Sequence, residues 1–104
     1  MKPISVDADA EDELQAAWRW YEEQVRGLGA ELLSAVDQKL LRIQRSPGRF
    51  PLVTGPARKF GVRRALLLGF PFAIYFTELE AELRVLAVAH QRRRPGYWRK
   101  RLGH

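Results

Sequence analysis

Residues 70–77 (Phe-Pro-Phe-Ala-Ile-Tyr-Phe-Thr) and residues 83–90 (Leu-Arg-Val-Leu-Ala-Val-Ala-His) decide the fold class of this chain. In the first stretch, bulky apolar side chains occupy every second position, which is typical of a β-strand with one buried face. The second stretch is apolar at nearly every position, which indicates a central strand buried on both faces. Because only the short, acidic segment 78–82 separates them, we expect the two strands to pair antiparallel.

A third strand is expected just before these two, over residues 59–68. Its side chains alternate, and Gly69 marks a tight turn into the next strand. One face of this strand carries Phe60, Val62, Leu66 and Leu68, and the other carries Lys59, Arg63 and Leu67. Arg64 interrupts the apolar face, so it is either held at a functional site or covers the core with its aliphatic stem, and we give the two interpretations equal weight.

The first half of the chain has a helical period instead. Apolar side chains recur every three or four positions over residues 10–28 and again over residues 32–43. Asp7 or Asp9 supplies a side-chain acceptor that can cap the first helix. Pro47 disfavours continuation of the second helix beyond residue 46. The pattern predicts a helical hairpin.

These elements predict an α+β fold, with an N-terminal helical hairpin packed on a small, mainly antiparallel β-sheet. A chain of 104 residues is long enough for one core, so we expect a single domain. Its expected parts are an edge strand over 1–6, the hairpin over 8–46, a β meander over 58–90 and a basic tail over 91–104.

Two absences bound the possible chemistry. The chain has no cysteine, which excludes disulfides and thiolate metal sites and fits a reducing compartment. No apolar run approaches the roughly 20 residues that span a bilayer. We therefore expect a cytoplasmic protein that has no metal, no cofactor and no membrane association.

Charge is segregated along the sequence. Seven carboxylates lie within residues 7–23, whereas residues 39–64 contain eight Lys/Arg and no acid, and residues 84–104 contain seven Lys/Arg and no acid. The formal net charge is +6. The segregation predicts a cation-rich sheet surface, left open for a polyanion or an acidic partner. A surface that only confers solubility is the weaker alternative.

Residues 91–101 are the most unusual stretch, because six cations are interleaved with Tyr97 and Trp98. Aromatic side chains in such a context either stack on nucleic-acid bases or pin the segment to the sheet. We favour packing for Trp98 and give the two interpretations equal weight for Tyr97.

The ordered set of short motifs resembles the RelE/ParE superfamily of toxins, and especially its ParE-like "plasmid stabilization" members. The set spans most of the chain and keeps the order of two helices followed by a β meander. It consists of Trp20-Tyr21-Glu22, Phe50-Pro51, Arg63-Arg64 before Leu66-Leu67-Leu68, residues 70–76, and residues 85–90 followed by Arg92-Arg93-Arg94-Pro95-Gly96-Tyr97-Trp98.

This resemblance implies the toxin of a type II toxin–antitoxin system, neutralised by a cognate antitoxin protein. ParE-like members inhibit DNA gyrase without a known hydrolytic site, whereas RelE-like members cut messenger RNA on the ribosome. A third alternative is a non-toxic member that acts only as an antitoxin-binding module. The fold is compatible with all three alternatives, so individual residues must distinguish them.

A metal-independent ribonuclease needs proton transfer and cations placed where phosphate charge develops. The candidate catalytic residues for such an activity are Arg64, His90 and Tyr97. A histidine side chain can serve as an acid or a base, but a lone histidine at a strand end, as expected for His90, is more often structural. The candidate polyanion- or target-binding residues are Lys59, Arg63, Arg64, Arg92, Arg93, Arg94 and Arg99.

One departure from the RelE-like pattern favours the non-hydrolytic alternative. RelE-like nucleases resemble one another in carrying several lysines and arginines on the sheet, with a tyrosine near the C-terminus. Lys59 is the only lysine in the sheet predicted here. We therefore expect gyrase as the target, with the ribosome and its messenger RNA as the alternative.

Overall fold

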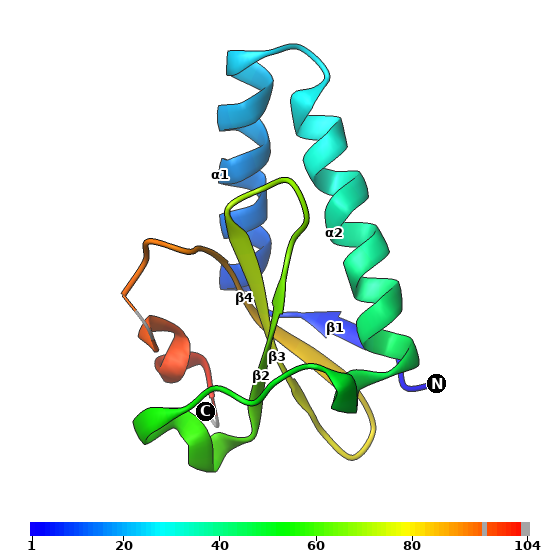
Figure 1. The fold of residues 1–104 in the computed structure, drawn as a ribbon, viewed down its shortest axis with the longest axis vertical. Helices are drawn as coiled ribbons and strands as arrows, with labels where there is room; N and C mark the ends of the chain where they lie inside the picture. The colour runs from blue at the N-terminus through cyan, green and yellow to red at the C-terminus, as the bar shows by residue number, and fades with distance from the viewer. Residues whose placement is uncertain (95, 103–104) are drawn as a thin grey trace.

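A helical hairpin is followed by a β meander in this chain, and a short first strand joins the meander into one sheet (Figure 1). The computed structural model describes residues 1–94 and 96–102, without the side chains of Pro56 and Ala57. Its elements are β1 (Ile4–Val6), α1 (Ala8–Gln24), α2 (Leu28–Arg45), the 3-10 turns η1 (Pro47–Arg49) and η2 (Gly55–Phe60), β2 (Val62–Leu66), β3 (Phe72–Glu78), β4 (Leu83–His90) and the 3-10 turn η3 (Tyr97–Arg101).

The sheet has the strand order β1-β4-β3-β2, so β4 is central and β1 and β2 form the edges. β3 pairs antiparallel with both β2 and β4, whereas β1 pairs in parallel with β4, with Ile4 opposite Leu83. The predicted α+β class and the mainly antiparallel sheet are thus confirmed. The buried, nearly continuous apolar sequence of β4 follows from its central place.

Local contacts hold the start and the turn of the helical hairpin. Asp7 caps α1, because its Oδ1 accepts a hydrogen bond from the Asp9 N–H at 3.0 Å. At the turn, the Glu22 carboxylate accepts hydrogen bonds from the N–H groups of Gly27 and Gly29, each at 2.9 Å. These bonds satisfy backbone donors at the start of α2 that have no partner within the helix.

One face of the sheet packs against the two helices and forms the main core. The helices contribute Leu32, Val36 and Ile43 to it, among others, and the strands contribute side chains such as Ile74 and Phe76. All five side chains are at most 3% exposed. The periodic apolar residues of the first half of the chain therefore cover the alternating apolar residues of the second half.

The opposite face of the sheet carries a second, smaller core. Val62, Leu86 and Ala87 lie there, and Trp98 of η3 packs on them with only 2% of its surface exposed. A β-bulge in β4 leaves Leu86 without an opposite residue on β3. The predicted packing role of Trp98 is confirmed.

The predicted strand over 59–68 is wrong at both ends. Lys59 and Phe60 belong to the turn η2, because a proline is the second residue of that turn and Gly61, with φ +68°, ends it in a left-handed conformation. β2 starts only at Val62. Leu68 lies beyond its end and is 78% exposed. The helix-facing side of this segment carries the buried Ala65 and Leu67 instead.

Two smaller expectations also change. The helical period predicted over residues 10–28 ends early, because Val25 is the C-terminal cap of α1 and is 59% exposed. The basic segment expected as a tail folds back instead, and its η3 turn packs on the sheet. Pro95, Gly103 and His104 of that segment lie outside the described residues.

Candidate functional site

The carboxylate of Glu13 holds the C-terminal segment against the body of the protein. Its Oε1 accepts hydrogen bonds from Arg101 Nη1 at 2.9 Å and from the Val88 N–H at 3.0 Å. Its Oε2 accepts hydrogen bonds from the Tyr97 hydroxyl and from Arg101 Nη2, the latter at 3.2 Å. One acid of α1 thus joins η3 to β4, and we call Glu13, Tyr97 and Arg101 the carboxylate clip.

The clip decides which proton transfers Tyr97 can perform. Burial, followed by the hydrogen bond and the charge of Glu13, raises the pKa of Tyr97 well above its ordinary value of 10.0. The hydroxyl proton already points at a carboxylate, so Tyr97 is a poor general base near neutral pH. The pKa of Arg101 is also raised, because Glu13 outweighs the opposing effect of burial.

His90 lies at the end of β4 in a structural setting. Its Nδ1 accepts a hydrogen bond from the Arg92 N–H at 3.1 Å, and its ring packs edge-on against Phe72 with the ring centroids 5.2 Å apart. Phe72 packs against the main core, on the helix side of the sheet. This Nδ1 is therefore occupied by the turn that follows the strand.

The two arginines of β2 point to opposite faces of the sheet, because successive side chains alternate along a strand. Arg64 shares the face of Val62 and is exposed, beside Tyr75 on the neighbouring strand. Arg63 shares the face of Ala65, and its Nη1 donates a hydrogen bond to the Phe50 carbonyl at 2.6 Å. Arg64 is thus exposed, whereas Arg63 is half-buried.

The remaining candidate cations lie outside the sheet. Lys59 is exposed on η2, with its Nζ 5.2 Å from the centroid of the Phe60 ring. In the segment between β4 and the end of η3, Gln91 and Lys100 are exposed, and so are four candidate arginines: Arg92, Arg93, Arg94 and Arg99. Within the described part of the chain, none of these four forms an ion pair. We call these four residues the arginine cluster.

Arg93 rests on an aromatic ring. Its guanidinium carbon lies 4.0 Å from the centroid of the Tyr97 ring, which is cation–π distance. Arg99 donates from Nε to the Gly96 carbonyl at 3.1 Å. The clip therefore fixes the aromatic ring on which Arg93 rests.

The structure brings some of the predicted site residues together and separates others. Tyr97 and Arg93 are in contact. His90 and Arg64 lie on opposite faces of the sheet, so the predicted catalytic set of Arg64, His90 and Tyr97 does not meet at one point. The expectation of one open, cation-rich sheet surface is also wrong, because Arg63 faces the helix side and η3 covers part of the other face.

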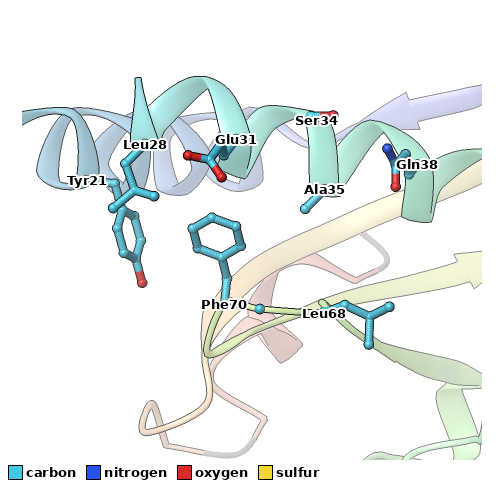
Figure 2. A pocket seen from close by; sticks show the side chains of 9 residues that line it. Tyr21, Leu28, Glu31, Ser34, Ala35, Gln38, Leu68 and Phe70 are labelled. Carbon is cyan, nitrogen blue, oxygen red and sulfur yellow. The ribbon is translucent and has the colours of Figure 1, made fainter. Parts of the chain in front are cut away.

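A groove runs between α2 and the turn that joins β2 to β3. Figure 2 shows the ring of Phe70 standing between the two helices and this turn, with Leu68 on the same turn. The groove has a volume of about 480 Å³ and is lined by Tyr21, Leu28, Glu31, Ser34, Ala35, Gln38, Leu68, Gly69 and Phe70. Its lining is thus apolar on the turn and mixed on α2.

Sequence reasoning missed Glu13 and Arg101, the two charged members of the clip. Glu13 resembles the other acids at the start of α1, and Arg101 resembles the other cations of its segment. A pairing across 88 residues has no local signature. The available signal was the position of Glu13 itself, three residues after the buried Ala10 and therefore turned toward the core side of α1.

Two general properties complete the description. Among the residues that the structure describes, no group of three or more His, Cys, Asp or Glu side chains is placed to hold a metal ion. Over the same residues, no helix combines the length and the apolar character that crossing a membrane requires.

The fold and these contacts define an α+β protein in which a helical hairpin and a short C-terminal turn cover opposite faces of one sheet. Its structure is similar to a chain of the "Chromosomal ParDE TA system from P. aeruginosa", with a TM-score of 0.74 and 17% sequence identity, over 86% of this chain and 96% of that one. No protein-family model and no curated protein sequence matches the chain. The ParE-like fold implied by the sequence resemblance is thereby confirmed.

Proposed function

We propose that this chain is the toxin of a type II toxin–antitoxin module, that it inhibits DNA gyrase and so replication, and that a cognate antitoxin neutralises it. The observation that carries the proposal is the structural similarity to a chain of a ParDE toxin–antitoxin system over most of both chains. Such a toxin would act in the cytoplasm, where gyrase and its DNA are found.

The geometry of the candidate residues supports an inhibitor that does not hydrolyse RNA. His90 uses Nδ1 to hold its own turn, and the Tyr97 hydroxyl is bound to Glu13. Arg64 lies on the sheet face opposite to His90. A general acid and a general base must reach the same phosphate, and these side chains do not converge.

The arginine cluster is the surface that we propose for the target. Its four guanidinium groups are exposed, and Arg93 is held over the Tyr97 ring. Arginine forms paired hydrogen bonds with carboxylates and phosphates, so the cluster suits an acidic protein surface or the DNA that gyrase holds.

The groove beside α2 is the surface that we propose for the antitoxin. Leu68 is 78% exposed at its rim, although an apolar side chain gains free energy by leaving water. An amphipathic segment of the antitoxin would cover Leu68 and Phe70 with its apolar side. The target and the antitoxin would then contact different parts of this chain.

Expression of the chain in a bacterial host tests the proposal directly. We expect growth to stop and plasmid DNA to lose negative supercoiling, and we expect purified protein to inhibit supercoiling by purified gyrase. Ribosome-bound messenger RNA should stay intact in the same cells. Codon-specific RNA cleavage would identify a ribonuclease instead, and harmless expression would identify a binding module without toxicity.

Charge-reversal variants test the arginine cluster. Replacing Arg92, Arg93 and Arg94 by Glu should abolish inhibition of gyrase, because the target would meet repulsive charge. The matched control replaces Arg42, Arg45 and Arg49, which are also exposed and lie along the end of α2 and in η1. Equal loss in both triple variants would show that only net charge matters and would remove the cluster from the proposal.

The antitoxin surface needs a separate pair of variants. Leu68→Asp should abolish binding of the antitoxin encoded beside this chain, while inhibition of gyrase remains. Leu79→Asp is the matched control, because Leu79 is 42% exposed in the turn at the other end of β3. Binding that survives Leu68→Asp would exclude the groove as the antitoxin surface.

A further inference from the structure

The second half of β4 forms an unpaired edge of the sheet, although its first half is covered by β1. β1 pairs with β4 only from Leu83 to Val85, so no strand among the described residues pairs with residues 86–90 on that side. The Gln91 N–H bonds to Pro71 on the β3 side, so the N–H groups of Val88 and His90 face the unpaired side. Such an edge is a template for another strand.

The carboxylate clip occupies part of this edge in place of a strand. Glu13 accepts the Val88 N–H at 3.0 Å, and Arg101 Nη1 donates to the Leu86 carbonyl at 2.8 Å. One side chain thus satisfies a donor of the edge and the other satisfies an acceptor. Two charged side chains reproduce the polar contacts that a neighbouring strand would make.

The same segment covers apolar surface next to the edge. Trp98 of η3 packs against Val62, Leu86 and Ala87, which are fully buried. Removal of η3 would expose the edge and this apolar patch together, and an exposed apolar edge strand promotes association.

We infer that residues 96–102 act as a cover over a strand-pairing edge, and that the partner this edge accepts, when the cover is released, is β4 of a second copy of the chain. Residues 86–90 contain no Asp, Glu, Lys or Arg in a chain of net charge +6. Two copies of this edge can therefore meet antiparallel about a two-fold axis without placing like charges opposite each other. This inference is independent of the target proposed above.

Arg101→Gln tests the cover, with Arg84→Gln as the matched control. Both arginines are bound to carboxylates at the start of α1, because Arg84 Nη2 lies 2.8 Å from Asp7 Oδ2, but only Arg101 contacts the β4 edge. At low concentration we expect the exchange rate of the Val88 amide hydrogen to rise about tenfold or more in Arg101→Gln alone. At high concentration the variant should sediment as a dimer and regain protection at Val88.

Tyr97→Phe provides a milder second variant in case Arg101→Gln does not fold, because it removes one hydrogen bond and keeps the ring. It should shift the equilibrium between the covered monomer and the dimer by a smaller amount than Arg101→Gln does. The inference is overturned if both folded variants stay monomeric at every concentration, or if they dimerise while Val88 and His90 remain unprotected. Equal dimerisation of Arg84→Gln would also overturn it, since that residue does not touch the cover.

Discussion

The two faces of the sheet are closed in different ways. On the helix side, α1 and α2 cover the strands with a continuous set of buried aliphatic and aromatic residues, for example Ile43 and Phe76. On the other side, a turn of five residues provides one large apolar side chain, Trp98, and depends on the clip for its position. Apolar packing therefore holds one face, whereas charged hydrogen bonds direct the covering of the other.

The largest expected effect compares one aromatic residue from each face. Phe76→Ala should lower the free energy of unfolding by about 4 kcal/mol, because a buried aromatic side chain leaves a cavity in a rigid core. Trp98→Ala should lower it by about 3 kcal/mol, because the short turn can shift and partly fill the space. Urea denaturation of both variants measures the difference. A larger loss for Trp98 would reverse the comparison.

A smaller effect is expected from the clip. Glu13→Gln keeps the size of the side chain but removes the charge that binds Arg101 and Tyr97. We expect a loss of about 2 kcal/mol in the free energy of unfolding, the typical contribution of charge-assisted hydrogen bonds. Hydrogen exchange should locate the change at β4 and η3, with α2 unaffected. Uniform loss of protection through α2 would show that the two faces are not separate.

The alkaline pH dependence sharpens the assignment of Tyr97. Its pKa is raised in the folded state, so above about pH 10 the unfolded chain releases a proton that the folded chain retains. Below that pH the Tyr97 hydroxyl makes its full contribution to the free energy of unfolding. This contribution falls as the pH rises further. In Tyr97→Phe the decline should be less steep, as measured by denaturation at a series of alkaline pH values. An unchanged slope would contradict the role given to the Glu13 hydrogen bond.

The smallest effect is expected from the exposed ion pair of Lys2 and Glu78, which joins the first residues to the end of β3 at 3.0 Å. Lys2→Ala should change the free energy of unfolding by about 0.5 kcal/mol or less, because exposed pairs are screened by water. Thermal denaturation with and without added salt measures the contribution of this ion pair to stability. A loss as large as that of Glu13→Gln would mean that burial does not explain the strength of the clip.

Short-range patterns explain what the sequence could predict. The 3.6-residue period yields the two helices, and the two-residue period yields β3 and most of β2. The continuous apolar sequence of β4 correctly indicated a central strand. Each of these patterns is created by one element facing a core, so it can be seen within a single stretch of sequence.

The errors arise where turn residues or distant residues decide the structure. Lys59 continues the alternation of β2, but the proline and Gly61 around it favour a 3-10 turn. The parallel pairing of Ile4 with Leu83 joins the two halves of the chain without any local signal. The candidate site was least predictable, because charged residues of one type look alike until a partner such as Glu13 selects Arg101 among them.

The distance along the chain between Glu13 and Arg101 has a consequence for synthesis. These residues are 88 positions apart, and Asp7 is 77 positions from its partner Arg84. At a translation rate of about 5–20 residues per second, the first strand and first helix exist for on the order of ten seconds before their partners are made. During that interval, chaperones or other proteins can reach surfaces that the finished molecule hides.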